Sequence, residues 1–318
     1  MSKTQWPKVV VVGGGTGMPV LLSGLKHLPV HLTSLVNVVD DGGSTGRLRK
    51  EREMPAPGDV RNVIAALSEA EPTLLKLFQH RFSNNEDLNG HSLGNMLLVA
   101  LSEVTGDFMQ GIQEVSRVFN VKGNIYPISN ESLSLHAEMA DGTILSGESN
   151  IPLAEKKIKR VYLEPSHIKP LSNAIQSLKE ADLIVISPGS LYTSILPNLI
   201  IPDVFETIKQ SDAKKVYVCN VMTQNGETTG YTAADHLKAI YDHTEQGWID
   251  TVIVHNEQIN EEVLAHYREE KAYPVIVDED RLQELGVNIV SKNIIQYQQH
   301  IIRHNKKKIA QLLYDLIT

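Results

Sequence analysis

The sequence contains one cysteine, Cys219, and few aromatic residues, which make up 5% of the chain. A single thiol cannot form a disulfide within the chain, and it excludes the thiol-rich sites that hold structural zinc. Cys219 lies in the apolar run 216–221, where a buried packing role is favoured. No apolar run approaches the roughly 20 residues of a membrane span, and the run 9–12 is too short for a signal peptide. We therefore expect a cytoplasmic protein without a membrane span.

Positive charge is also scarce, because 30 Lys and Arg face 38 Asp and Glu, for a net charge of −8. This balance argues against a nucleic acid as partner, since such binding depends on basic surface. Several catalytic patterns are missing: the P-loop lysine, the nucleophile elbow and the HExxH zinc motif. The twelve histidines show no paired metal-ligand spacing. What remains is an ordinary globular composition, with 42% hydrophobic residues, that can bury a large core.

The order of the predicted elements indicates an α/β fold. Short β-branched runs at 8–12, 32–39, 182–187, 214–220, 250–254 and 273–277 alternate with amphipathic stretches at 17–27, 59–69, 171–180, 203–210 and 233–242. Strands that are apolar without alternation are typical of a parallel sheet buried on both faces. We therefore predict a Rossmann-like, doubly wound, mostly parallel sheet in a single domain, 1–318.

The middle of the chain, at about 71–160, departs from this rhythm and is interpreted as an inserted helical and antiparallel β segment. Helical patterns occur at 73–82, 92–103 and 108–119, and 124–160 is rich in β patterns. Asp141 and Gly142 predict the tight turn of a hairpin there. The stretch 305–318 predicts a closing helix.

The first candidate site is the glycine-rich stretch after the first predicted strand, with Gly13, Gly14, Gly15, Thr16 and Gly17. Glycines let the backbone approach a phosphate closely, and a helix start offers free N–H groups and a positive dipole end. The dinucleotide pattern is incomplete, because Met18 stands where the third glycine belongs. A tight turn without a ligand is the alternative.

Two adjacent acids, Asp40 and Asp41, follow the second predicted strand, where a dinucleotide fold places its ribose-binding acid. One carboxylate would hold a ribose or a metal such as Mg²⁺, and the other would orient it. A flexible surface turn is the alternative. Asp41 is the candidate metal ligand, and Asn37 lies just before the pair.

Polar residues crowd two predicted helix starts. In the first, Gly58 precedes Asp59, for which an N-cap role is favoured, and Arg61 and Asn62 follow in the first turn. In the second, His91 and Asn95 open an otherwise apolar helix. Gly94 would weaken that helix by about 1 kcal/mol relative to alanine, so a close approach is expected there. His91 is either an acid–base group or phosphate donor, or a histidine bonded to the backbone.

Two later predicted strands also end in polar loops, which parallel pairing would place on the same edge as the glycine loop. Small and hydroxyl residues follow one of them: Pro188, Gly189, Ser190, Thr193 and Ser194. Amide and hydroxyl side chains that suit a sugar or base follow the other: Asn220, Thr223 and Gln224.

Taken in order, GGGTGM, VNVVDDGGSTG, PGDVRN, NGHSLGN, SPGSLYTSILPNL and CNVMTQNGETTGY resemble the YvcK-type gluconeogenesis factors, over roughly residues 8–315. That family is related to the phospholactate transferases. The resemblance implies a Rossmann-like sheet with an insertion. It also implies nucleotide-sugar binding and a role in cell shape and wall synthesis during growth on gluconeogenic carbon sources. The transferase relatives bind a guanine nucleotide and a divalent metal near the acids that match Asp40 and Asp41.

Three functions follow as hypotheses. The first is a regulatory protein that binds a UDP-sugar or another nucleotide without turnover. The second is a metal-dependent transferase acting on a nucleotide-diphosphate donor, with Asp40, Asp41 and His91 as catalytic candidates and Mg²⁺ as metal. The third, an NAD-dependent enzyme, is least favoured because of Met18. A homodimer is the base-rate expectation for such a protein.

Overall fold

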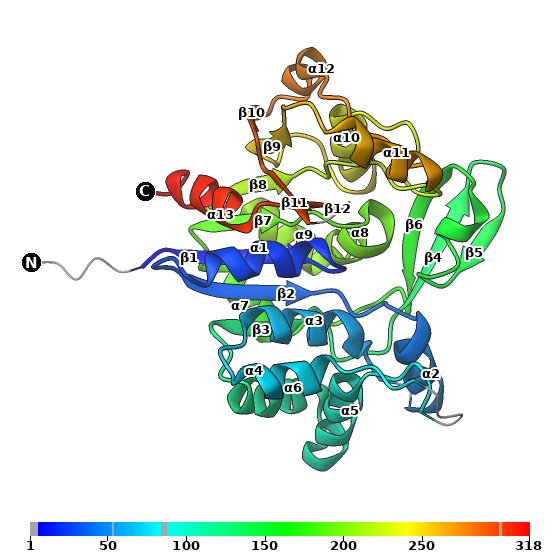
Figure 1. The fold of residues 1–318 in the computed structure, drawn as a ribbon, viewed down its shortest axis with the longest axis vertical. Helices are drawn as coiled ribbons and strands as arrows, with labels where there is room; N and C mark the ends of the chain where they lie inside the picture. The colour runs from blue at the N-terminus through cyan, green and yellow to red at the C-terminus, as the bar shows by residue number, and fades with distance from the viewer. Residues whose placement is uncertain (1–5, 53, 84–87, 299–300) are drawn as a thin grey trace, which may run out of the picture.

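The computed structural model describes residues 6–52, 54–83, 88–298 and 301–318. A seven-stranded sheet forms its centre, in the order β10-β9-β8-β7-β1-β2-β3, and every pairing is parallel (Figure 1). The strands are β1 (Lys8–Gly13), β2 (His31–Val36), β3 (Asn124–Pro127), β7 (Leu183–Ile186), β8 (Lys214–Val218), β9 (Thr251–His255) and β10 (Asn288–Lys292). The predicted α/β Rossmann-like class is confirmed.

Strand order reverses beside β1, and this reversal positions the site. From β1 the chain proceeds to β2 and β3 on one side of the sheet, and it later returns to β7 on the other side of β1. In such sheets, ligands bind beyond the carboxyl ends of the strands at the point of reversal. The β1 residues Val9, Val10, Val11 and Val12 are almost fully buried, as their uninterrupted apolar run predicts.

Helices cover both faces of this sheet (Figure 1). Helix α1 contacts both α3 and α13 along one face, whereas α9 contacts both α7 and α8 along the other. Helices α4, α5 and α6 pack together beside α3. The helices are α1 (Gly17–Leu25), α2 (Gly43–Arg52), α3 (Pro57–Leu67), α4 (Pro72–Gln79), α5 (Leu93–Thr105), α6 (Phe108–Val118), α7 (Ser172–Lys179), α8 (Leu196–Leu199), α9 (Pro202–Gln210), α10 (Ala233–His243), α11 (Glu261–Glu269), α12 (Glu279–Glu284) and α13 (Lys306–Asp315). Within the described residues, no helix is long and apolar enough to cross a membrane.

A smaller antiparallel sheet, in the order β5-β4-β6, stands beyond the carboxyl edge of the central sheet (Figure 1). Its strands are β4 (Ser134–Met139), β5 (Ile144–Ser146) and β6 (Ile158–Glu164). The predicted hairpin turn is confirmed: Gly142 has a φ of +84°, and the Thr143 amide donates to the Asp141 carboxylate at 2.9 Å. β3 lies within the stretch read as insertion, but it pairs with β2 in the central sheet.

The prediction of a strand at 273–277 is wrong, because this segment forms no strand of the central sheet. Only an isolated bridge between Met222 and Pro274 forms there. The backbone of this segment instead serves the loop after β8: the Val275 amide donates to the Val221 carbonyl, and the Ala233 amide donates to the Ile276 carbonyl. The seventh strand is β10, which is only half-buried and so lacks the apolar run that marks the other strands.

Candidate functional site

A cleft of about 380 Å³ opens at the carboxyl ends of β1, β7 and β8, beside the point where strand order reverses. Eight of the predicted ligand-binding residues line it: Thr16, Gly17, Pro188, Gly189, Ser190, Asn220, Thr223 and Gln224. They come from three loops that are far apart in sequence. The expectation that these loops share one edge is therefore met in the structure, while their binding role stays a prediction.

The glycine loop is built for close packing. Gly15 has a φ of +65°, which favours glycine. At Gly17, an added Cβ would lie 2.2 Å from the Pro188 carbonyl oxygen, so the loops after β1 and β7 meet with no room for a side chain. The two loops therefore form one rigid wall.

Amide side chains join the loops after β7 and β8. Asn220 accepts from the Gly189 amide at 3.0 Å and donates to the Gly189 carbonyl at 2.7 Å. The Gln224 Nε2 donates to the Ser190 hydroxyl at 2.8 Å, whereas its Oε1 is buried and has no partner among the described residues. An orphaned acceptor beside a cleft suits a ligand hydroxyl or N–H.

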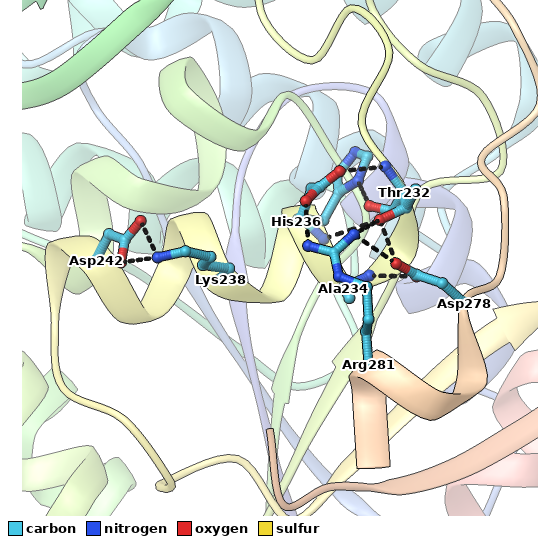
Figure 2. Close-up of polar contacts among 8 residues, drawn as sticks. Thr232, Ala234, His236, Lys238, Asp242, Asp278 and Arg281 are labelled. Carbon is cyan, nitrogen blue, oxygen red and sulfur yellow. Dashed lines mark hydrogen bonds and ion pairs between the residues drawn. The ribbon is translucent and has the colours of Figure 1, made fainter. Parts of the chain in front are cut away.

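The far end of the loop after β8 is held by a network at the start of α10, drawn in Figure 2. Asp278 accepts from the Ala234 amide at 2.9 Å and from the Thr232 hydroxyl at 2.7 Å. Arg281 donates to Asp278 at 2.8 Å and to Asp235 at 2.7 Å, and Asp235 also closes a capping box with Thr232. This network holds the loop in place without using its cleft-facing side chains.

The third wall of the cleft comes from residues that the sequence did not reveal. Tyr267 on α11 and Arg303 on the hairpin of β11 (Ile295–Gln298) and β12 (Ile301–His304) both line it. Arg303 is the only Arg or Lys among the described lining residues, and Glu270 is the only acid. The hairpin rests on a small apolar cluster, separate from the main core, of Val221, Val263, Ile295 and Ile302.

Behind the cleft, the predicted residues Asn37, Thr193 and Ser194 are buried. Asn37 donates to the Thr193 carbonyl at 3.1 Å. Thr193 and Ser194 belong to a π-helical turn, Leu191–Ile195, and π-turns are frequent at functional sites. The buried Glu227 accepts from the Tyr192 amide at 3.0 Å and from the Thr193 hydroxyl at 2.8 Å, and so holds this turn.

On the other side of the glycine loop, the edge is acidic. Asp40 accepts from the Gly42 amide at 2.9 Å and lies over Gly58, where an added Cβ would meet its carboxylate at 2.1 Å. Asp41 accepts from the Ser149 amide at 2.9 Å and so contacts the loop that follows β5. The two carboxylates point in different directions, as expected for adjacent residues.

Asp59 is not the N-cap that the sequence suggests. The N-cap of α3 is Ala56, and Asp59 lies inside the first turn. Its carboxylate is buried and accepts from the Gly15 amide at 2.8 Å, across to the glycine loop. Burial raises the pKa of Asp59 to about 7, against the opposing effect of the Gly15 N–H. The sequence misled because Pro57-Gly58-Asp59 has the composition of a helix start.

Glu148, which the sequence analysis did not single out, completes the acidic half. It follows β5, and burial together with the charges of Asp40, Asp59 and Asp41 raises its pKa to about 8. Asp40, Asp41, Asp59 and Glu148 therefore share one electrostatic environment. In the described ranges, however, no group of three or more His, Cys, Asp or Glu residues has the arrangement of a metal site. The Mg²⁺ ligand role of Asp41 stays a prediction.

Arg61 and Asn62 lie next to this acidic half. The Arg61 guanidinium donates to the Asn62 side chain at 2.7 Å. Burial is the main cause that lowers the pKa of Arg61, and the charges of Asp40 and Asp59 oppose this lowering. Gly94 makes room for this arginine. An added Cβ there would lie 2.6 Å from the Phe78 carbonyl oxygen and 2.8 Å from the Arg61 Cγ, so the expected close approach is confirmed.

His91 and Asn95 contact α2 rather than the cleft. The His91 Nδ1 lies 3.1 Å from the Ser44 hydroxyl. Asn95 donates to Ser44 and to Thr45, each at 3.3 Å, and its buried Oδ1 has no partner among the described residues. These residues connect the start of α5 to the first turn of α2, which directly follows the two acids.

Fold and cleft together define a Rossmann-like α/β protein with a candidate small-molecule site at the reversal of strand order. Comparison with known proteins refines this class. The family model described as 2-phospho-L-lactate transferase CofD matches residues 9–295. The chain belongs to this CofD family, and it is also similar to relatives named gluconeogenesis factor over nearly its whole length.

Two such relatives illustrate the similarity. A gluconeogenesis factor of Halalkalibacterium halodurans is 58% identical over 307 residues, which cover 96% of this chain and 95% of the relative. A gluconeogenesis factor of Bacillus subtilis is 53% identical over 313 residues, which cover 98% of this chain and 99% of the relative. A crystal structure of a Bacillus halodurans protein superposes with a TM-score of 0.96 at 57% identity, covering 97% of this chain and 99% of the other. Another crystal structure, described as that of a member of the upf0052 family, superposes with a TM-score of 0.94 at 58% identity, covering 96% of this chain and 99% of the other.

Proposed function

We propose that the protein binds a nucleotide-sugar or related nucleoside diphosphate in the cleft, without turnover. We further propose that this binding regulates cell shape and wall synthesis during growth on gluconeogenic carbon sources. The observation that carries the proposal is the composition of the cleft: tight backbone loops, neutral donors, one guanidinium and a single acid, Glu270, with four other carboxylates gathered on the other side of the glycine loop.

Each part of such a ligand has a counterpart in the cleft. A diphosphate suits the start of α1 at Gly17 and the guanidinium of Arg303, since helix N-termini and arginine both favour phosphate oxygens. Met222 and Tyr267 offer apolar surface for a base. The orphaned Gln224 Oε1 would accept from a sugar hydroxyl. The name of the relatives supports the gluconeogenic setting.

A metal-dependent transferase is the second candidate. Asp40, Asp41, Asp59 and Glu148 gather there, and the pKa values of Asp59 and Glu148 are raised by burial and by neighbouring carboxylates; a divalent cation would be stabilised in these surroundings. The description of the matching family points the same way. In this reading, Asp40 and Asp41 would hold the cation, and it would neutralise the diphosphate.

Thermal stabilisation of the purified protein separates these functions. The panel contains UDP-sugars, GDP, NAD and NADP, each with and without Mg²⁺. A ligand at about 100 times its Kd should stabilise the protein by about 2.7 kcal/mol. Stabilisation by UDP-sugars alone, indifferent to Mg²⁺ and with the ligand intact afterwards, supports the regulatory function. A Mg²⁺-dependent shift with consumption of the nucleotide supports the transferase. No shift with any ligand overturns both.

A charge-insertion variant then tests the cleft itself. Thr16 lines the cleft, and its side chain makes no capping hydrogen bond. Thr16→Glu therefore adds a negative charge to the cleft without removing a capping hydrogen bond. We expect the Kd for the stabilising nucleotide to rise at least about tenfold through charge repulsion. The matched control is Gln113→Glu on the exposed side of α6. Equal affinity in the two variants would place the nucleotide elsewhere.

A further inference from the structure

A second cavity, of about 740 Å³, lies at the opposite end of the central sheet from the cleft. Its walls come from the connection between α1 and β2, from the start of β2 and from the residues where β3 begins. The polar and aromatic lining residues are Trp6, Lys26, His27, His31, Lys122 and Asn124. None of the sequence motifs described above contributes to it.

The charge of this cavity is opposite to that of the whole chain. Its described lining contains two lysines and two histidines but no Asp or Glu, in a protein of net charge −8. Burial lowers the pKa of Lys26, and the nearby Lys122 and Lys306 lower it further. Glu69, just outside the lining, opposes this effect and pairs with Lys122 at 2.9 Å. Several cations thus share one carboxylate.

The cavity also has an apolar component. Trp6 is 53% exposed, although an indole is among the side chains that gain most from burial. Its ring centroid lies 5.9 Å from that of His31, at an interplanar angle of 44°. Leu28, Pro29, Val30 and Leu32 add apolar surface to the lining. An aromatic face beside ammonium groups suits a ligand that is both planar and anionic.

We propose that this cavity is a second ligand site, which binds a small anion with a planar apolar body, such as an aromatic phosphate monoester. The lysines would neutralise the anion, and Trp6 and His31 would pack against the planar part. The volume lies within the range of about 300–1,000 Å³ usual for small-molecule sites. Helix α1 joins the two sites, because it begins at the glycine loop of the cleft and ends beside Lys26.

Fluorescence provides a direct test, because the chain has two tryptophans and Trp248, at 6% exposed, is buried against Phe205. The probe is phenyl phosphate, with inorganic phosphate and phenol as its two halves. We expect phenyl phosphate to quench the emission and to bind at least about tenfold more tightly than either half, since each half gains only one kind of contact. Trp6→Phe should remove the quenching while thermal stabilisation by phenyl phosphate persists.

Charge variants complete the test. The double variant Lys26→Gln/Lys122→Gln should raise the Kd at least about tenfold, because it removes both ammonium charges. The matched control is Lys156→Gln/Lys159→Gln, two exposed lysines on the antiparallel segment that pair with carboxylates, as Lys122 does with Glu69. Arg303→Ala in the cleft should leave the quenching unchanged. Absence of quenching in the wild type, or equal losses in the lysine and control pairs, would overturn the proposal.

Discussion

The two halves of the carboxyl edge differ in chemistry although they share one glycine loop. Between β1, β7 and β8, the cleft offers neutral donors and Arg303. Between the glycine loop, α3 and the loop after β5, four carboxylates gather, and those of Asp59 and Glu148 have raised pKa values. One half is suited to phosphate, and the other to protons or a cation.

The Gly15 amide marks the border between the halves. In a phosphate-binding loop such an N–H would face the ligand, but here it donates to Asp59 at 2.8 Å. The carboxylate thus occupies a position that a phosphate oxygen would otherwise take. The glycine-rich turn after β1 therefore does not define the position of a phosphate by itself. The loops after β7 and β8 must position the ligand.

The largest expected effect comes from breaking the wall that the loops after β1 and β7 form on the cleft side. Gly17→Ala would place a Cβ 2.2 Å from the Pro188 carbonyl oxygen, so backbone must shift. We expect a loss of about 2–3 kcal/mol in the free energy of unfolding, typical of overpacking, together with loss of nucleotide stabilisation. Denaturant unfolding measures the first and thermal shift the second. Gly106→Ala is the control, with a φ of +76° but open space, and should cost only about 1 kcal/mol.

Removing the guanidinium of the cleft comes next. Arg303→Ala should raise the Kd for a nucleoside diphosphate about tenfold, because charge-assisted contacts with phosphate contribute roughly 1.5–3 kcal/mol. Isothermal titration would measure this. Arg268→Ala removes an exposed arginine of α11 that pairs with Glu261 and does not line the cleft. If both variants bound equally well, Arg303 would have no part in recognition.

A smaller effect is expected from the acidic half, and it depends on pH. Because the folded-state pKa of Glu148 is raised to about 8, the folded protein holds a proton that the unfolded chain releases near pH 4.5. Stability is therefore lost as pH rises through this window. At pH 8, the free energy of unfolding of Glu148→Gln should be about 1 kcal/mol higher than that of the wild type, after allowance for solvent screening. Below pH 4.5, the two free energies of unfolding should be equal. The exposed Glu284→Gln is the control and should show no such trend.

The smallest effect is expected from Asp41→Asn. The new amide oxygen can still accept from the Ser149 amide, so the fold should be retained. In a regulatory protein without turnover, nucleotide affinity should change less than about threefold, well under 1 kcal/mol. A transferase would instead lose turnover outright. Product analysis by chromatography beside the binding titration distinguishes the two, and unchanged affinity without any turnover would remove the acid pair from the site.

Local sequence patterns predicted the loops of the cleft well. The residues at Gly17, Gly189 and Gln224 follow buried apolar strands, and parallel pairing brings the ends of such strands to one edge. The same logic failed at 273–277, where an apolar run supports a loop. It also missed β10, whose half-buried residues mix polar and apolar side chains.

Other parts of the site had no local signal. Tyr267 and Arg303 reach the cleft from a helix and a hairpin that carry no recognisable motif. Glu148 lies in the loop after β5, and only the folded arrangement brings it within the field of Asp40 and Asp59. Asp59 looked like an ordinary cap, because the sequence does not show that its partner, the Gly15 amide, lies across the fold.

The hairpin wall of the cleft has a consequence for how a ligand enters and leaves. Val221, Val263, Ile295 and Ile302 form a cluster apart from the main core, so we expect the hairpin to open at a lower free energy than the parallel sheet. Its amides should exchange with deuterium faster than those of β1, and a bound ligand that contacts Arg303 should slow that exchange. Residence time in the cleft would then be set by the opening of these few apolar contacts, and not by the stability of the domain.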